Sequence, residues 1–313
     1  MVEFVYGVPG SGKTSYIMSR LLADVRSGRR AFLIVPEQQT VDVERTIAGQ
    51  LPPSAQLYIE ALNFSRLANR VFRERGGLVY NYADKSRKQL FMWRAIRECS
   101  PFLTEYSGRA TDSSLPSAML DSVREFKNCG VTPEALSDAA RKLSAGDGSD
   151  RALGKKLTDL SLVYAAYDAL LGQNYTDSDD DLSRLAEKLA EAPYFTGTAV
   201  YIDSFSSFTK QEHEIIRLIM RQAEETLITL PLDSPRDRAL CALSSKKCSD
   251  RIRRDASALG ITPQIICLGE NRRAGNEELR AVCEQFHDMS KTAEIPTQAR
   301  GHIELYSLCD TYS

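Results

Sequence analysis

The sequence lacks any bulk charge of one sign and any long apolar run. Lys and Arg number 40 and Asp and Glu number 42, so the net charge of -2 gives no overall attraction to nucleic acid or to an anionic membrane. No apolar stretch approaches the roughly 18 residues that a membrane span needs. Residues 2–6 are too short for the apolar part of a signal peptide. We therefore expect a cytoplasmic protein without a membrane partner.

Clustered metal ligands are also missing. The seven cysteines are scattered, are odd in number and form no C-x-x-C pair, and the three histidines lie far apart in the sequence. This pattern argues against zinc and against an iron-sulfur cluster within these residues, and favours reduced thiols in a cytosol.

What the sequence does contain is a glycine-rich loop close to its start. Residues 3–6 are rich in β-branched and aromatic types and predict a strand, and residues 15–25 predict a helix. Between them lies Gly-x-x-x-x-Gly-Lys-Thr, the spacing of a phosphate-binding loop, in which glycines let backbone amides turn towards phosphate oxygens. The predicted ATP-binding residues are Gly7, Gly10, Ser11, Gly12, Lys13 and Thr14.

A second nucleotide motif is predicted at residues 199–203, where four apolar residues end in Asp203. Asp203 and the Thr14 hydroxyl are the expected ligands of Mg²⁺. In helicase ATPases a glutamate follows this aspartate and activates the attacking water, whereas here Ser204 follows it. Glu212 or Glu214 could substitute, but both are expected to point elsewhere on the next helix. The sequence therefore predicts nucleotide binding with slow or absent hydrolysis.

The order of patterns predicts an α/β fold with a large helical insertion. Strand and helix patterns alternate over residues 1–83, with strands expected at 31–36 and 56–60, which favours a parallel sheet with crossover helices. Residues 84–195 show apolar residues almost only at helical spacing. Sheet patterns return over residues 196–270, where we expect a strand at 226–230 and a helix at 236–259. Residues 271–313 are polar and end in a strand-like run, 302–308, which we expect to lead towards a second domain.

An acidic run at residues 177–181 leaves two interpretations open. Clustered carboxylates can hold a metal ion, but carboxylates in the first turn of a helix more often cap it and compensate its dipole. The second interpretation is preferred.

The motifs together resemble a known family, the N-terminal part of the B subunit of the bacterial ATP-dependent helicase/deoxyribonuclease (AddB of AddAB, or RexB-like). The resemblance runs over nearly the whole chain and rests on "GVPGSGKT", "LIVPEQQT", "ALNFSRLANRVF", "GKKLTDLSLVYAAYDALL", "YTDSDDDLSRLAEKL" and "VYIDSFSSFTKQEHEII".

The resemblance implies a RecA-like P-loop domain of the superfamily 1 helicase kind, an AddA-like partner subunit, and contact with single-stranded and double-stranded DNA. It also implies that this region is an inactivated helicase module, and that the nuclease domain and iron-sulfur cluster lie beyond residue 313. The residues it places on the DNA face are Gln38, Gln39, Thr40, Phe64 and Arg66. For Phe64, a core position is slightly favoured over stacking on a base.

Three other functions remain open. A small-molecule or nucleoside kinase also begins with this loop, although the large helical insertion and the missing arginine-rich lid count against it. A GTPase is weaker, because no Asn-Lys-x-Asp stretch occurs. A scaffold with a vestigial loop is the third.

Overall fold

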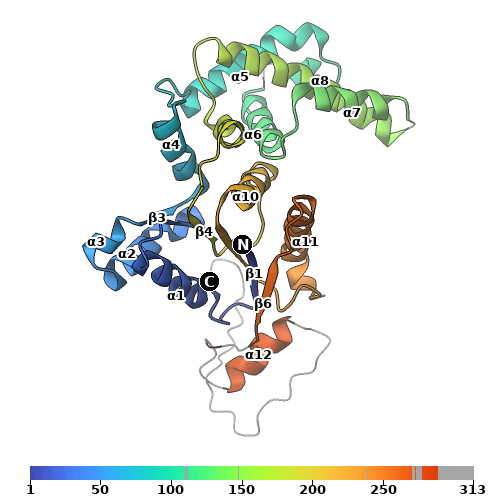
Figure 1. Cartoon of the computed structure of the whole chain (residues 1–313). Coiled ribbons are helices and arrows are strands. Elements are labelled where there is room, and N and C mark those ends of the chain that lie inside the picture. Colours follow the sequence, from blue (N-terminus) through green and yellow to red (C-terminus); the bar gives the residue numbers. More distant parts are fainter. Residues whose placement is uncertain (110–111, 147, 238, 270–271, 273–276, 288–313) are drawn as a thin grey trace, which may run out of the picture. The chain divides into compact units, whose positions relative to one another are not determined.

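The strand-like runs of the sequence pair into one parallel sheet. The computed structural model describes residues 1–287 except 110–111, 147, 238, 270–271 and 273–276. Within these, the six strands lie in the order β3-β2-β4-β5-β1-β6, and neighbouring strands pair in parallel (Figure 1). The strands are β1 (Val2–Gly7), β2 (Ala31–Ile34), β3 (Ile59–Leu62), β4 (Ala199–Ile202), β5 (Glu225–Leu230) and β6 (Gln264–Leu268).

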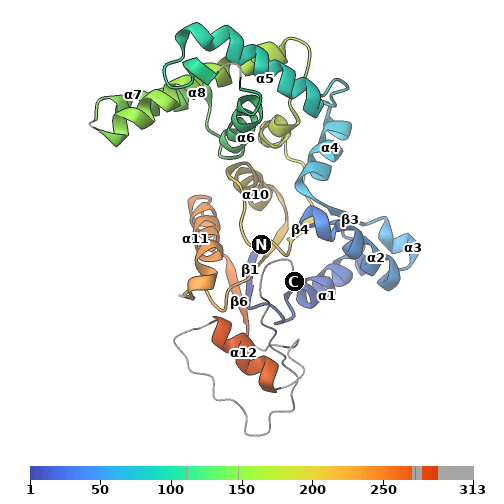
Figure 2. The same ribbon diagram turned by 180° about the vertical axis from the view of Figure 1, so that it is seen from behind.

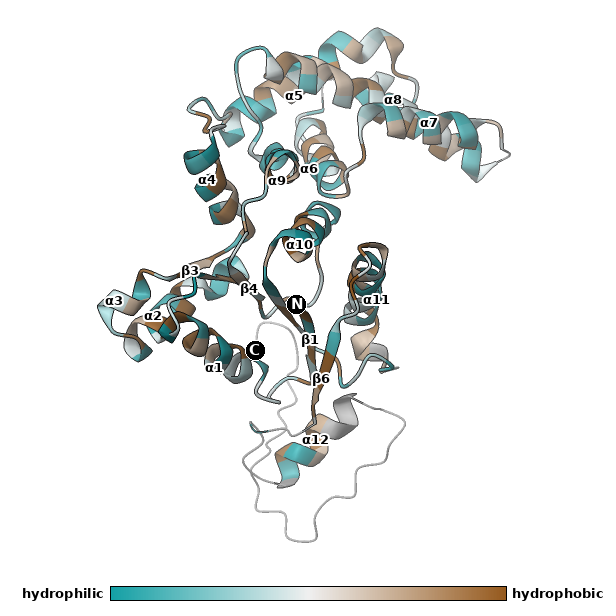
Figure 3. Cartoon of the chain, viewed as in Figure 1, coloured by the Kyte–Doolittle hydropathy of each residue, from teal (hydrophilic) through white to brown (hydrophobic). Residues whose placement is uncertain are grey.

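Burial explains why the inner strands read as continuous apolar runs. Every residue of β1, β2, β4 and β5 is buried, as expected for a parallel sheet covered on both faces. Strand β6 lies at the edge and is partly exposed, and Figure 3 shows β1 and β6 hydrophobic along most of their length.

Helices α1 and α11 cover opposite faces of the sheet. Ile17 and Leu21 of α1 (Lys13–Arg26) pack with Val5 in one buried cluster. The side chain of Tyr6 points to the other face, where its hydroxyl and Ser249 Oγ of α11 (Leu243–Ala258) are 2.9 Å apart. Figures 1 and 2 show the two helices on either side of β1.

The chain divides into two compact units. The α/β unit comprises Met1–Phe64, Pro193–Phe208 and the chain from Ile216 onwards, and the helical unit comprises Ser65–Ala192 and Thr209–Ile215. The helical unit thus starts at Ser65 rather than at the sequence-based boundary of residue 84, because α4 (Phe64–Arg75) belongs to it from its second residue.

The core of the helical unit is formed by three of its helices. Met92 of α5, Met119 of α6 and Tyr167 of α8 belong to one buried cluster. The helices of this unit between α4 and α10 are α5 (Lys85–Cys99), α6 (Leu115–Asn128), α7 (Pro133–Ser144), α8 (Ser149–Gly172) and α9 (Asp181–Glu191). The apolar residues at helical spacing therefore form helices, as the sequence predicted.

The helical unit also recruits a short segment from much later in the sequence. Helix α10 (Lys210–Gln222) begins in this unit, where Gln211 Nε2 donates to Ser183 Oγ at 2.9 Å and Lys210 Nζ donates to the Gly130 carbonyl at 3.3 Å. Residues 65–192 alone are therefore not the complete unit.

Several element boundaries differ from the sequence-based ones. The predicted strand at residues 56–60 lies at 59–62, because Pro53 starts a short helix, α3 (Pro53–Gln56), in front of it. The predicted helix at 236–259 begins only at Leu243, since the Asp237 carboxylate accepts bonds from the amides of Asp233 and Ala239 and holds a turn there. The α/β unit also contains helices α2 (Thr40–Gln50) and α12 (Glu277–His287).

Helix α12 lies in the polar stretch after residue 270, where the sequence predicted no helix. The expected strand at 302–308 lies outside the described residues. No helix in the described part of the chain has the length and apolar character to cross a membrane.

Candidate functional site

The glycine-rich loop joins β1 to α1 and adopts backbone conformations that favour glycine. Gly10 and Gly12 have φ angles of 91° and 88°, in the left-handed region. A Cβ placed on Gly7 would lie 2.1 Å from Ser11 Oγ, a distance no side chain tolerates. Both the curl of the loop and its close packing therefore require glycine at these positions.

The loop has polar groups suited to phosphate. No side chain caps the first turn of α1, so the amides there are not satisfied by a capping residue. Lys13 Nζ donates to the carbonyl oxygens of Gly7 and Val8 at 2.6 and 3.0 Å. Ser11 Oγ is buried and has no hydrogen-bond partner among the described residues. This cradle fits the oxygens of a polyphosphate.

Asp203 lies beside this loop although it is 189 residues from Thr14 in sequence. Thr14 Oγ1 donates to Asp203 Oδ2 at 2.8 Å. Strand β5 lies between β1 and β4, so the two motifs reach each other across one intervening strand at the carboxyl edge of the sheet. A hydroxyl and a carboxylate are the hard oxygen ligands that Mg²⁺ takes, so the residues present fit that ion.

Thr229, on the intervening strand, holds the second oxygen of the same carboxylate. Its Oγ1 donates to Asp203 Oδ1 at 2.5 Å, and both residues are buried. The sequence reasoning missed Thr229. The signal that could have found it is a polar residue near the carboxyl end of a buried central strand.

Ser204 follows Asp203 in a conformation that is rare for a side-chain-bearing residue. Its φ is 68°, the only positive φ of a non-glycine residue in the described part of the chain. Its amide donates to Thr229 Oγ1 at 3.4 Å. The position at which helicase ATPases carry a general base thus holds a hydroxyl in a strained turn.

The possible substitute base Glu212 is engaged in a helix cap. Its carboxylate accepts from the Thr209 amide at 2.7 Å, and Thr209 Oγ1 accepts from the Glu212 amide at 3.2 Å. This reciprocal pair is a capping box at the start of α10. Burial raises the pKa of Glu212.

The residues expected to contact DNA differ in accessibility. Gln38 and Gln39 are exposed in the turn after β2, and Arg66 is exposed on α4. Thr40 is buried and its hydroxyl donates to the Pro36 carbonyl at 3.3 Å. The two glutamines and Arg66 are thus the members of this set that reach solvent.

Phe64 is 4% exposed and packs against two other aromatic rings. Its ring centroid lies 5.6 Å from that of Phe205 and 6.3 Å from that of Phe208. Phe64 thus occupies a core position, the alternative that the sequence slightly favoured.

The acidic run of residues 177–181 lies among lysines. Asp177 caps the following turn by accepting from the Asp179 amide at 3.0 Å, as the preferred interpretation expected. It also lies 2.5 Å from Lys88 Nζ and 3.0 Å from Lys127 Nζ. Burial alone would raise the pKa of Asp177, but Lys127 and Lys88 lower it to about 2. In the described residues no group of three or more His, Cys, Asp and Glu side chains is placed to hold a metal ion, the acidic run included.

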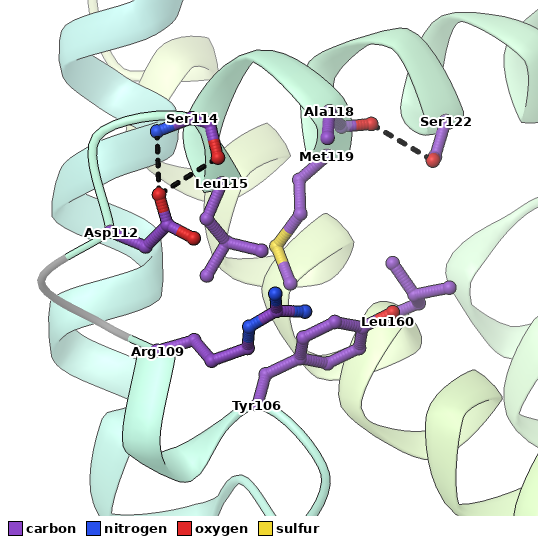
Figure 4. Close-up of a pocket in the computed structure, with 9 residues that line it drawn as sticks. All are labelled: Tyr106, Arg109, Asp112, Ser114, Leu115, Ala118, Met119, Ser122 and Leu160. Atoms are coloured by element: carbon purple, nitrogen blue, oxygen red, sulfur yellow. Dashed lines mark hydrogen bonds between the residues drawn. The ribbon is translucent and has the colours of Figure 1, made fainter.

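A small cavity lies within the helical unit, and none of the predicted site residues lines it. Its volume is about 220 Å³, and Figure 4 shows the side chains of Tyr106, Arg109 and Met119 converging on it. Asp112 at its rim accepts from the Ser114 amide at 2.9 Å. Its lining carries no arrangement of catalytic groups.

The family described as "ADDB, N-terminal" matches residues 4–282 of this sequence. The chain belongs to that family. Three proteins named as the B subunit of an ATP-dependent helicase/deoxyribonuclease illustrate the AddB likeness. Those of Caldanaerobacter subterraneus and Thermoanaerobacter sp. are each 28% identical over the whole chain and 27% of their own length. That of Acetivibrio thermocellus is 31% identical over 74% of the chain and 20% of its own length.

The chain therefore spans about a quarter of the length of the AddB relatives it matches.

A further residue beside the phosphate loop of this AddB region escaped the sequence reasoning. The Arg272 amide donates to the Gly10 carbonyl at 2.9 Å, and its side chain lies against Gly12. It comes from a polar stretch without any recognisable pattern, so no signal in the sequence points to it.

Proposed function

We propose that this chain is the nucleotide-binding, DNA-handling N-terminal module of an AddB-like helicase/nuclease subunit that works in double-strand-break repair in the cytoplasm. Its α/β unit is a RecA-like P-loop core that binds ATP with Mg²⁺ and hydrolyses it slowly or not at all. The relatives are named as one subunit of a larger enzyme, which supports a partner subunit of the AddA kind.

The contact of Thr14 with Asp203 is the observation that carries this proposal. A phosphate loop alone is compatible with many reactions, whereas a loop threonine 2.8 Å from a buried carboxylate at the end of a parallel strand forms a paired oxygen site. Thr14 and Asp203 would hold Mg²⁺, Lys13 would exchange the Gly7 and Val8 carbonyls for phosphate oxygens, and the α1 amides would hold the β-phosphate. Bound MgATP supplies the phosphoanhydride bond and the charge that these groups orient.

Ser204 is the reason to expect little turnover. A serine hydroxyl does not take a proton from water near neutral pH, and general-base assistance contributes about 10²- to 10⁴-fold to a rate. Glu212 is bound in its capping box. The chain would therefore retain the nucleotide instead of cycling through hydrolysis.

Nucleotide binding is tested with a fluorescent ATP analogue. Lys13→Ala is expected to weaken binding at least about 10-fold because it removes a charge-assisted contact with phosphate. Lys155→Ala, at an exposed position on α8, is the matched control and is expected to leave binding unchanged. Failure of the analogue to bind the unaltered chain, with no change in Lys13→Ala, would support the vestigial-loop scaffold instead.

Hydrolysis is tested by steady-state ATPase measurements with and without single-stranded DNA. We expect turnover well below about 1 s⁻¹, the low end of ordinary enzymes, and a rise in Ser204→Glu. DNA-stimulated turnover above that value in the unaltered chain would contradict the inactivated-helicase proposal. Phosphate transfer to a metabolite would favour the kinase alternative.

A further inference from the structure

Helix α5 of the helical unit has an outward face that its core does not use. Lys88, Met92 and Ile96 face inwards and are buried. On the other side, Leu90 is 61% exposed and Trp93 is 41% exposed. A tryptophan is costly to leave in water, and large exposed apolar side chains grouped on a surface mark binding sites.

An arginine holds the Trp93 ring in place. The Arg97 guanidinium lies one helical turn further on, 4.7 Å from the ring centroid. A cation over an indole face is attracted by the ring quadrupole. The pair therefore forms a preorganised aromatic platform in which the positive charge of Arg97 covers one face of the indole.

The charge carried by helix α5 itself is mainly positive. Helix α5 carries five basic residues, Lys85, Arg87, Lys88, Arg94 and Arg97, and one acidic residue, Glu98. Lys88 is neutralised in the core by Asp177 and Asp179, and Arg94 and Arg87 form exposed pairs with Glu98 and Asp84 at 2.7 and 3.2 Å. The exposed pairs are weak and can be exchanged for other anions, so the face as a whole favours a negatively charged ligand.

We propose that this α5 face is a binding site for single-stranded nucleic acid, in which one base stacks on Trp93 while Arg97, Arg94 and Lys85 contact phosphates. Stacking on an exposed aromatic next to a positive track is the way proteins bind single strands without reading sequence. Gln89, which precedes Trp93 by one helical turn and is exposed, adds an amide able to bond a base edge.

Charge decides between this ligand and a protein partner. Tryptophan, arginine and leucine are also common at the centre of protein interfaces. A protein would need an acidic surface to match a helix whose exposed cations outnumber its exposed carboxylates, whereas every nucleotide brings both an anion and a flat ring. The inference rests on the DNA-handling part of the proposed function and places a contact surface on the helical unit, separate from Gln38 and Gln39.

The chain provides its own reporter for this site, because Trp93 is its only tryptophan. Titration with a short oligothymidylate at low salt is expected to quench the tryptophan emission, since the base stacks on the indole. The quench is expected to disappear as salt rises, because cation release contributes a slope of about 0.7 for each phosphate contact. A labelled oligonucleotide followed by anisotropy reports binding at any surface in parallel.

Variants separate stacking from charge. Trp93→Ala is expected to weaken oligonucleotide binding roughly 10-fold, within the range measured for a lost base stack, whereas Trp93→Phe keeps most of the affinity. Arg97→Gln is expected to weaken binding and to lower the salt slope. Arg141→Gln, on an exposed arginine of α7 in the same unit, is the matched control and should change nothing. Circular dichroism on heating checks that each variant is folded.

The outcomes distinguish this inference from the proposed function. Oligonucleotide binding without a Trp93 quench, and unaffected by Trp93→Ala, would overturn the α5 site and leave the DNA-handling proposal standing. Absence of binding by anisotropy at low salt would overturn both. Shielding of Trp93 by an AddA-like partner but not by oligonucleotide would show a protein interface and overturn the site as stated here.

Discussion

Two buried aspartates, one in each unit, are held in opposite ways. In the helical unit Asp177 lies between the ammonium groups of Lys88 and Lys127. In the α/β unit Asp203 accepts its hydrogen bonds from the neutral hydroxyls of Thr14 and Thr229. Both side chains are nearly inaccessible, at 2% and 3% exposure.

The difference separates a structural carboxylate from a functional one. A buried anion matched by two cations has its charge satisfied, and it ties the loop before α9 to α5 and α6. A buried anion held by hydroxyls keeps its orientation and its capacity to attract a cation. An acidic run therefore attracts attention in the sequence, yet the single Asp203 is the better candidate for binding Mg²⁺.

The largest effect is expected on the structural side. Lys127→Met removes a buried cation that pairs with Asp177 at 3.0 Å and with the partly exposed Asp168 and Asp180 at 3.1 and 2.8 Å, and it leaves the buried Asp177 with Lys88 alone. We expect a loss of about 3–5 kcal/mol in the free energy of unfolding by denaturant. Lys188→Met, which breaks an exposed pair with Glu191, is the control and should cost less than about 1 kcal/mol. Similar losses in both variants would show that the buried cluster around Asp177 stabilises the fold no more than an exposed ion pair does.

Acid should weaken the same cluster. The pKa of Asp177 is lowered to about 2 in the fold, against about 3.9 in an unfolded chain. A lowered folded pKa gives stability that is present above about pH 4 and is lost as the pH falls towards 2. The cost of Asp177→Asn relative to the unaltered chain should therefore shrink by about 2 kcal/mol over that window.

Denaturant unfolding at a series of pH values measures this change. Burial raises the pKa of Asp168 and Asp180, whose contributions vary in the opposite direction, and subtracting the two curves reduces their influence. Asp121→Asn, on an exposed residue of α6, serves as control. A cost of Asp177→Asn that does not depend on pH would show that the negative charge of Asp177 does not contribute to stability.

On the functional side, two threonines of β5 allow a matched test. Thr229→Val removes the hydroxyl that orients Asp203, while Thr226→Val removes a buried hydroxyl without a hydrogen-bond partner in the described residues. Thr229→Val is expected to weaken binding of an ATP analogue about 10-fold in Mg²⁺ and little in EDTA, as one lost hydrogen bond to a charged group implies. Thr226→Val is expected to bind normally, and equal effects of the two changes would rule out a positioning role.

The smallest effect concerns the strained serine. Ser204→Gly relieves the left-handed conformation, which costs a non-glycine residue about 1–2 kcal/mol, but adds the backbone entropy of glycine. The net change in unfolding free energy should be a gain of up to about 1 kcal/mol. Ser206→Gly, two residues on and without a positive φ, should instead lose about 0.5–1 kcal/mol. A loss in both variants would mean that Ser204 is not strained.

The strands and helices could be predicted because their signals are local. Runs of mainly apolar residues indicated β1, β2, β4 and β5, and apolar residues at helical spacing indicated α5 to α9. Both signals can be read from a short stretch of sequence. The phosphate loop was equally readable, since left-handed angles at Gly10 and Gly12 and the tight packing at Gly7 require glycine at a fixed spacing.

The partners of those residues depend on tertiary contacts that no local pattern encodes. Thr229 meets Asp203 only through the strand order, and Arg272 meets the loop from a polar stretch that carries no sequence pattern. The lysines of the acidic run come from α5 and α6, at least 50 residues earlier in the chain. Two element starts shifted for a related reason, because Asp237 and Pro53 stabilise competing turns.

The second crossing of the chain into the helical unit affects how this protein can be made and cut. Because residues 209–215 complete that unit, it cannot finish folding on the ribosome until the strand carrying Asp203 has already been synthesised. A proteolytic or recombinant piece that ends at residue 192 would leave the Ser183 hydroxyl and the Gly130 carbonyl without the partners that α10 brings. The helical unit is thus formed by two segments, residues 65–192 and 209–215, of which the second is synthesised last. Any attempt to express it separately or move it to another protein needs both segments.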